Sequence, residues 1–134
     1  MKNKARDRGA TAVEVALLMP VVLFLVMGLI DFGRAVNAKI TLSQAAREGV
    51  RVVALNKSDP TGRAVSAATG LKNVSATVVS SCPVGSAGTK NGELKASYTF
   101  DFITPVGGLA GMFGGGSFGS PITLSATGVM LCES

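Results

Sequence analysis

The chain has 134 residues, enough for one small domain, and 47% of them are hydrophobic although only 5% are aromatic and none is Trp. This composition suits a chain whose apolar residues are concentrated in one segment. His is absent, so the commonest general base and the commonest neutral metal ligand are missing, and we expect no cofactor. Of the net charge of +5, residues 1–9 supply +3 through four basic residues and Asp7. The remainder is nearly balanced, which argues against nucleic-acid binding.

An apolar run near the N-terminus predicts a membrane helix. Residues 15–30 carry no charge, and extending the run back to Ala10 adds only Glu14. As a helix, residues 10–30 would be ~31 Å long, close to the thickness of the hydrocarbon core of a bilayer. The basic residues 1–9 predict that the N-terminus stays in the cytoplasm and that the rest of the chain lies outside. We therefore expect a single-pass protein of the cytoplasmic membrane.

The helical pattern continues beyond the apolar run. A removable secretory signal would need a small-x-small cleavage site here, but the run leads into the charged segment 31–34. Apolar or small residues instead recur at spacings of three and four: Phe32, Val36, Ile40, Ser43, Ala46, Val50 and Val53. This is the pattern of one helix face. We expect one helix from about residue 10 to about residue 55, with residues 31–55 as its extracytoplasmic continuation.

The remaining residues, 56–134, are expected to form a small α+β head domain. Asp59 followed by Pro60 predicts the start of a short helix that runs to about Thr69 and is closed by Gly70. Three later runs alternate apolar and polar residues with a period of two: 74–78, 94–102 and 122–127. They predict a three-stranded antiparallel sheet, on which the outer half of the long helix packs.

The two cysteines, Cys82 and Cys132, both fall in the predicted head. A head with few aromatic residues has a thin core, so a disulfide between them is expected, with two buried free thiols as the alternative. Two lone cysteines without His make a poor metal site. The sequence therefore favours a covalent link over a metal centre.

The Gly-rich stretch 107–119 contains four large apolar residues: Leu109, Met112, Phe113 and Phe118. A phosphate-binding loop needs a strand before it and a helix after it, whereas a strand is predicted to follow this stretch. We expect the stretch to touch the membrane surface or a neighbouring subunit. No nucleophile has an evident base, and Asp59, Glu93 and Asp101 are scattered, so the chain is not expected to be an enzyme.

Residues 8–54 resemble the TadE-like family, the minor pilins or pseudopilins of tight-adherence (Flp-type) pilus systems. Three pieces carry the resemblance in order: Arg8-Gly9-Ala10-Thr11-Ala12-Val13-Glu14-Val15-Ala16-Leu17-Leu18-Met19-Pro20, Ile30-Asp31-Phe32-Gly33-Arg34 and Ala45-Ala46-Arg47-Glu48-Gly49-Val50-Arg51. A softer similarity lies in Tyr98-Thr99-Phe100-Asp101-Phe102, followed by Thr104-Pro105. The family often has an aromatic residue directly after the Glu, where this chain has Val15.

The resemblance implies that a prepilin peptidase removes residues 1–9 by cutting between Gly9 and Ala10. Glu14 would become the fifth residue of the mature chain and would pair with the N-terminal amine of a neighbouring subunit. A buried charge is tolerable when it is paired, so this contact would set the axial register of the subunits. Alternatively, Glu14 reaches the lipid headgroups and has no role. Pro20 is expected to kink or loosen the helix, which would aid helix packing in a filament, or to be an ordinary membrane-helix proline.

The implied function is that of a minor pilin or pseudopilin in pilus assembly and cell adhesion. Its implied partners are the prepilin peptidase, other pilin or pseudopilin subunits, the pilus assembly platform and the membrane. The subunit could enter a surface pilus, cap it or prime it, and the sequence leaves these open. The competing interpretation is a signal-anchored extracytoplasmic binding domain that is never processed and keeps residues 1–9.

Overall fold

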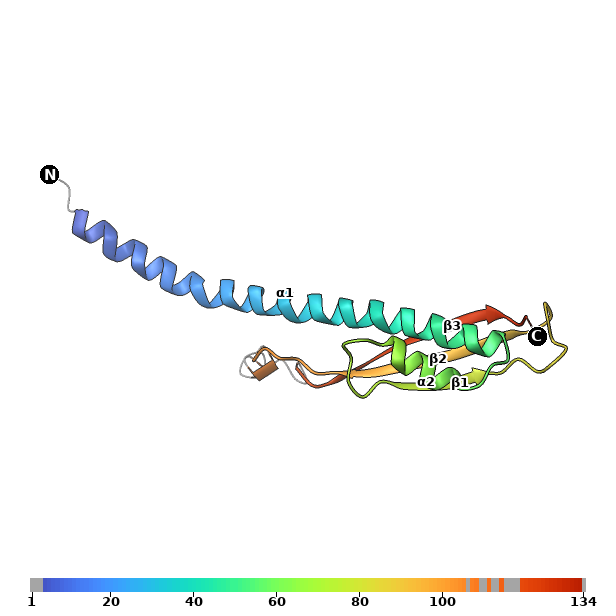
Figure 1. The fold of residues 1–134 in the computed structure, drawn as a ribbon. Coiled ribbons are helices and arrows are strands. Elements are labelled where there is room, and N and C mark those ends of the chain that lie inside the picture. Colours follow the sequence, from blue (N-terminus) through green and yellow to red (C-terminus); the bar gives the residue numbers. More distant parts are fainter. Residues whose placement is uncertain (1–3, 106, 109–110, 112–113, 115–118, 134) are drawn as a thin grey trace. The chain divides into compact units, whose positions relative to one another are not determined.

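Among the residues that the structure describes, the computed structural model has the elements α1 (Lys4–Ala54), α2 (Pro60–Ala67), β1 (Ser75–Ser80), β2 (Asn91–Phe100) and β3 (Ile122–Leu131), in this order (Figure 1). It describes residues 4–105, 107–108, 111, 114 and 119–133. The chain divides into two compact units, Met1–Gly33 with Phe102–Gly119 and Arg34–Asp101 with Ser120–Ser134. The predicted contact residues Leu109, Met112, Phe113 and Phe118 lie outside the described residues.

The second unit is a helix packed on an antiparallel sheet, which confirms the predicted α+β class. The strand order is β1-β2-β3, and both neighbouring pairs are antiparallel. Ala76, Ala96 and Ala126 pair across the three strands, and Leu94 lies opposite Gly128. These side chains share the inner face of the sheet, because side chains alternate between the two faces of a strand. The outer part of α1, from Arg34 onward, covers that face.

Small residues let α1 approach the sheet closely. A Cβ atom added at Gly128 would lie 2.5 Å from the backbone oxygen of Ala46, and one added at Gly49 would lie 2.7 Å from a Leu94 methyl carbon. Neither position can therefore hold a side chain without a shift of its neighbours. The buried core reflects this, because most of its members are small or of medium size: Leu42, Ala46, Val50, Val53, Ala64, Cys82, Leu94, Ala96, Ala126 and Cys132.

The prediction of a single apolar stripe along the outer part of α1 is wrong. Ala46, Val50 and Val53 are buried, but Val36 and Ile40 are 41% and 53% exposed. The buried face instead passes through small residues and one large one: Ala38, Leu42, Ala45, Ala46, Gly49, Val50 and Val53. This face can approach the sheet closely because Gly128 leaves room there for the backbone of Ala46 and the side chain of Val50.

Helix α2 begins as predicted at the pair Asp59 and Pro60. The Asp59 side chain accepts a hydrogen bond of 2.9 Å from the backbone N–H of Gly62, which satisfies one of the free donors at the start of the helix. A Cβ atom at position 62 would lie 2.1 Å from the Asp59 carboxylate, so a side chain there would require that carboxylate to shift. The helix ends at Ala67, two residues before the predicted end, and Gly70 follows with a φ of +84°.

The close approach at Gly128 leads to a stability prediction. We expect Gly128→Ala to lower the free energy of unfolding by about 1–3 kcal/mol, the usual cost of overpacking, because the added methyl group meets backbone atoms of Ala46. Urea unfolding of the full chain in detergent micelles measures this. Thr123→Ala, at an exposed position of the same strand, is the control and should change stability by less than about 0.5 kcal/mol. Equal stability of the two variants would contradict the close packing.

Candidate membrane anchor and assembly site

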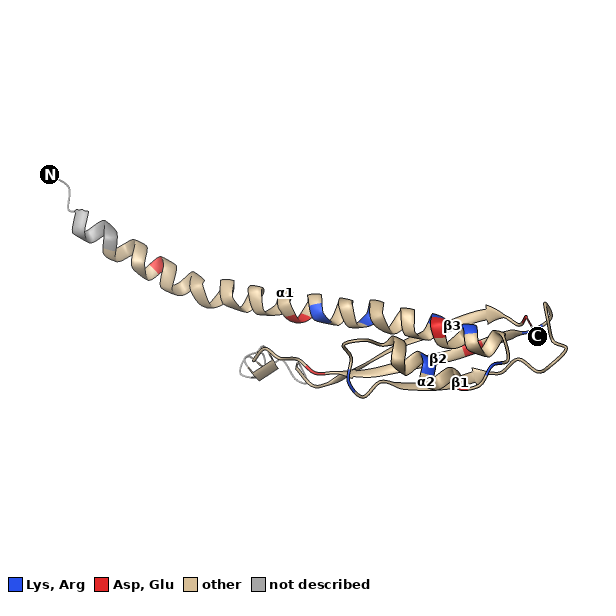
Figure 2. Ribbon diagram, in the orientation of Figure 1, with Lys and Arg blue, Asp and Glu red and all other residues tan. Residues whose placement is uncertain are grey.

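The N-terminal part of α1 exposes almost only apolar side chains. Every residue from Gly9 to Val26 is exposed, and the helix from Gly9 to Ala54 contains an 18-residue window with a mean hydropathy of 2.6 and no buried residue. In the described chain, α1 is the one helix long and apolar enough to cross a membrane. Figure 2 shows that charged residues are sparse in the part of α1 that follows the grey segment and more frequent toward its C-terminal end, and residues 9–30 carry Glu14 as their one charge. The helix is thus compatible with a single-pass membrane anchor.

Glu14 is the only ionisable residue between Gly9 and Ile30. Its side chain is exposed on α1, and it makes no ion pair with any described residue. A carboxylate in an apolar segment that crosses a bilayer is costly, on the order of 2.5 kcal/mol or more at the bilayer centre. Among the described residues, none forms an ion pair that would offset this cost.

Gly9, Ala10 and Pro20 all lie inside α1. A Cβ atom added at Gly9 would meet no atom within 4 Å, so the surroundings of the Gly9–Ala10 bond are open. Glycine is a poor helix former, so Gly9 lowers the helical stability of the first turns of α1. The helix continues through Pro20, whose missing N–H removes one hydrogen bond to Ala16.

Asp31, where the apolar run ends, is buried and has a structural role that the sequence did not reveal. Only 3% of it is exposed. Its carboxylate accepts hydrogen bonds from the backbone N–H groups of Ile103 and Thr104, both at 3.2 Å, and from the Thr104 hydroxyl. Hydrogen bonds to a carboxylate are stronger than those between neutral groups. Asp31 therefore holds the segment that follows β2 against α1 within the first unit.

Arg34 lies one turn further along α1 and contacts the end of β2. Its guanidinium carbon lies 5.0 Å from the centre of the Phe100 ring, a cation–π distance, and one guanidinium N–H donates to the carbonyl oxygen of Asp101 at 3.4 Å. Phe100 is 1% exposed, so the ring completes the core at this end of the sheet. Asp31 and Arg34 belong to residues 30–34, the second of the three sequence pieces that resemble the TadE-like family. Both residues make structural contacts within the chain.

The third family-like piece, residues 45–51, is also used inside the chain. Ala45 and Ala46 are fully buried, and Gly49 makes room for Leu94 and Ala64. The first piece, residues 8–20, differs from the other two because its residues from Gly9 onward are exposed. The exposed residues of the first piece are therefore available for contacts with lipid or with other proteins.

A disulfide joins Cys82 and Cys132, the pair expected from the sequence, with a Cα–Cα distance of 5.6 Å. The Cys132 N–H donates to the Lys90 carbonyl at 2.9 Å, and the next residue, Glu133, donates its N–H to the Ala54 carbonyl at 3.0 Å. The second bond satisfies one of the free carbonyls at the end of α1. The disulfide thus fastens the chain's C-terminal segment beside the end of the long helix.

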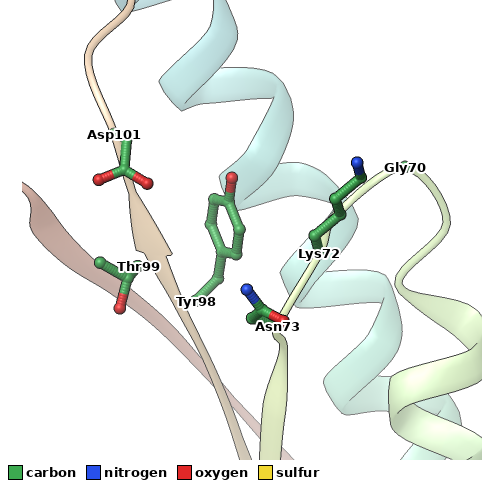
Figure 3. Close-up of a pocket in the computed structure, with 6 residues that line it drawn as sticks. All are labelled: Gly70, Lys72, Asn73, Tyr98, Thr99 and Asp101. Atoms are coloured by element: carbon green, nitrogen blue, oxygen red, sulfur yellow. The ribbon is translucent and has the colours of Figure 1, made fainter.

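A shallow pocket of about 540 Å³ lies at one end of the sheet. Figure 3 shows Tyr98 between Asp101 and Thr99 on one side and Lys72 and Asn73 on the other. These groups can donate and accept hydrogen bonds. They include no nucleophile next to a base of the kind that acyl-transfer chemistry requires.

The comparisons with known proteins support the resemblance to the TadE-like family. The model of the family described as TadE-like protein matches residues 9–51. The match begins at Gly9, passes through Glu14 and Asp31 and ends at Arg51 in the buried part of α1. Searches of the curated proteins and of the solved structures return no match. Residues 9–51, from the exposed apolar helix to the part of α1 that packs on the sheet, are therefore a TadE-like segment, and its family is one of structural proteins associated with Tad pili.

Proposed function

We propose that the protein is a minor pilin or pseudopilin of a tight-adherence pilus, anchored by α1 with its head outside the cytoplasm. A prepilin peptidase removes residues 1–9, and the new α-amino group at Ala10 is positively charged at neutral pH. Glu14 of one subunit then pairs with the Ala10 amine of the next. The partners of the subunit are other pilin or pseudopilin subunits and the assembly platform.

The observation that carries this proposal is Glu14, a carboxylate on an exposed apolar helix that makes no ion pair with any residue the structure describes. A subunit in the correct axial position supplies a cation to Glu14, and a subunit out of register leaves the charge unpaired in lipid. The open surroundings of Gly9 support the cut that creates this cation. The contacts of Arg34 and Gly49 with residues of β2 support a head that packs on the outer part of the same helix.

A second candidate function, a signal-anchored extracytoplasmic binding domain, is favoured by the polar pocket around Tyr98. In that case the helix only tethers the head, and residues 1–9 remain on the chain. The state of the N-terminus distinguishes the two functions, because only the pilin-like one needs a free amine at Ala10.

Cleavage is the most direct test. We expect native protein to begin at Ala10 and Gly9→Leu to block the cut, because the peptidase requires a residue without a side chain before the scissile bond. N-terminal sequencing and intact mass of chains extracted from membranes measure both. Gly28→Leu is a matched control, since Gly28 lies in the same helix and also has no atom within 4 Å of an added Cβ.

The control should be cut as efficiently as the wild-type chain. If the native chain is found to begin at Met1 or near Lys39, the pilin-like function loses its basis. The signal-anchored interpretation would then remain.

A further inference from the structure

The two outer strands of the sheet carry no charged residue. Glu93 and Lys95, the charged residues of the sheet, lie on the central strand β2, whereas β1 and β3 consist of uncharged residues alone. Strands that stay unpaired at a sheet edge usually carry charges, particularly Lys, that prevent other strands from pairing with them. Here the charges sit where a strand is already paired on both sides. Neither edge strand therefore carries the charges that usually prevent strand addition.

The hydrogen bond at the end of β3 shows which of its backbone groups face outward. The Cys132 N–H donates to the Lys90 carbonyl, one step beyond the pair Asn91 and Leu131. In an antiparallel ladder, hydrogen-bonded and non-hydrogen-bonded pairs alternate. The even-numbered residues of β3 therefore bond to β2, and its odd-numbered residues direct their N–H and C=O groups to the open edge.

Two contacts from α1 limit the open part of this edge. The Ser125 carbonyl accepts a hydrogen bond from the Lys39 ammonium, and the Glu133 N–H donates to the Ala54 carbonyl. Between them, the outward backbone groups of three residues have no partner in the described chain: Thr127, Val129 and Leu131. The Val129 side chain is 60% exposed. We call residues 127–131 the β3 window.

The opposite edge, on β1, offers a segment of the same length. Ser75 and Thr77 pair with odd-numbered residues of β2, whose backbone N–H and C=O groups point toward β1 and not toward β3. The backbone groups of the even-numbered residues of β1 therefore point to the open edge. The register shifts between Val78 and Ser80, and this irregularity ends the regular edge. We call residues 74–78 the β1 window. Its outward backbone groups also have no hydrogen-bond partner among the described residues.

We propose that the β3 window of one copy pairs with the β1 window of a second copy of this chain. In the order β1-β2-β3 with two antiparallel pairs, β1 and β3 run in the same direction. Copies that share one orientation through their membrane helices thus present edges that match as parallel strands. Both windows have five residues and no charge, so no repulsion opposes the contact. Because the two edges differ, the contact is head-to-tail, so each copy leaves one free edge of each kind for the next copy.

The proposal rests on the proposed function, since a pilin-like assembly is what gives neighbouring copies a common orientation. It adds to the Glu14 contact a second, lateral contact between heads. In a parallel pair that sets Val129 beside Thr77 of the second copy, Val129 bonds to the backbone of Ala76 and Val78. The side chains of Val129 and Thr77 then lie on the same face of neighbouring strands, ~4.8 Å apart along the hydrogen-bond direction.

The test is cysteine cross-linking of the full chain in membranes. Val129→Cys and Thr77→Cys chains with different affinity tags are co-expressed and oxidised. We expect cross-linked pairs that contain one chain of each kind, and at least tenfold fewer when either variant is expressed alone. The native Cys82 and Cys132 are bonded to each other and do not contribute. Lys95→Cys, on the central strand, replaces Thr77→Cys in the control and should give no pairs with Val129→Cys.

Cross-linked pairs of Val129→Cys with itself would show symmetric pairing and overturn the proposal, as would equal yields with Lys95→Cys. Absence of the mixed pair also overturns the proposed contact between sheet edges. If the cysteine variants are then still cut after Gly9 and recovered with pilus subunits, the proposed function stands without this contact. A chain that keeps residues 1–9 overturns the proposed function, and the inference with it.

Proline variants test the assigned direction of the backbone groups. Val129→Pro removes only an outward N–H, so we expect the head to fold and the cross-link between Thr127→Cys and Ser75→Cys to fall at least tenfold. Met130→Pro is the matched variant and removes an N–H that bonds to Gly92, so it should destabilise the head itself. A Val129→Pro chain that folds and cross-links at the parental yield would overturn the proposal.

Discussion

Replacement of both Cys82 and Cys132 by alanine is expected to lower the free energy of unfolding of the head by ~4 kcal/mol. The two residues are 50 positions apart, and the chain-entropy model assigns about this value to a closed loop of that length. Both cysteines are also buried, at 3% and 1% exposure, so the variant loses packing as well as the covalent link. Urea unfolding of the full chain in detergent micelles measures the change.

The loss should be large relative to total stability because small domains are stable by only about 5–15 kcal/mol. Wild-type chain unfolded in the presence of a reductant is the control, and its midpoint should move in the same direction. Single variants at either position should behave like the double variant, since each removes the same bond. An unchanged midpoint in the double variant would show that the core alone holds the head together.

The periodicity of apolar residues predicted the types of the elements. The boundaries of the elements depended on residues that this periodicity does not reveal. The second strand was predicted for residues 94–102 but runs from Asn91 to Phe100. Its first inward position is Gly92, which is buried against Val53 and Cys82 but has no side chain to mark it as apolar. A glycine on the inner face of a strand therefore shortens the strand that a sequence pattern predicts.

The third strand shows the opposite effect. It was predicted to end at Thr127 but continues to Leu131. Val129 and Leu131 are apolar yet lie on the exposed outer face, so they break the alternation on which the prediction depended. Both residues belong to the β3 window, so the failure of the pattern there coincides with the proposed contact surface.

The family-like residues were predictable as a set, but their separate roles were not. The sequence singled out Glu14 because it is alone in an apolar run, and the exposed helix retains that isolation. Asp31 and Arg34 gave no comparable signal, because their partners Ile103 and Phe100 are far away in the chain and meet them only through the fold. A charge next to a membrane segment would ordinarily be assigned to the lipid headgroups.

Glu14→Gln is expected to abolish incorporation of the subunit into an assembly while leaving membrane insertion, folding and cleavage intact. The amide keeps the size of the side chain and removes only its charge. Insertion should not suffer, because removal of a charge from an apolar helix favours the membrane. Cleavage should persist, because the Gly9–Ala10 bond lies about one helical turn away from Glu14.

Assembly should fail because the neighbour's Ala10 amine loses its partner. An ion pair broken within a low-dielectric environment costs about 3–5 kcal/mol, since it leaves an uncompensated charge, and 4 kcal/mol corresponds to nearly a thousandfold change in an equilibrium constant. Co-purification of tagged wild-type and Glu14→Gln chains with the other pilus subunits measures incorporation. Glu14→Ala should fail in the same way.

Glu48→Gln is the matched control, because it changes another carboxylate of the same helix. Glu48 lies in the outer part of α1 and pairs with Arg63 at 3.3 Å on an exposed surface, where an ion pair contributes about 0–1 kcal/mol. That variant should assemble normally. If Glu14→Gln were recovered in assembled complexes as well as Glu48→Gln, the Glu14 carboxylate would have no role in pairing. Apolar packing between helices and the contact between sheet edges would then be the remaining forces that join the subunits.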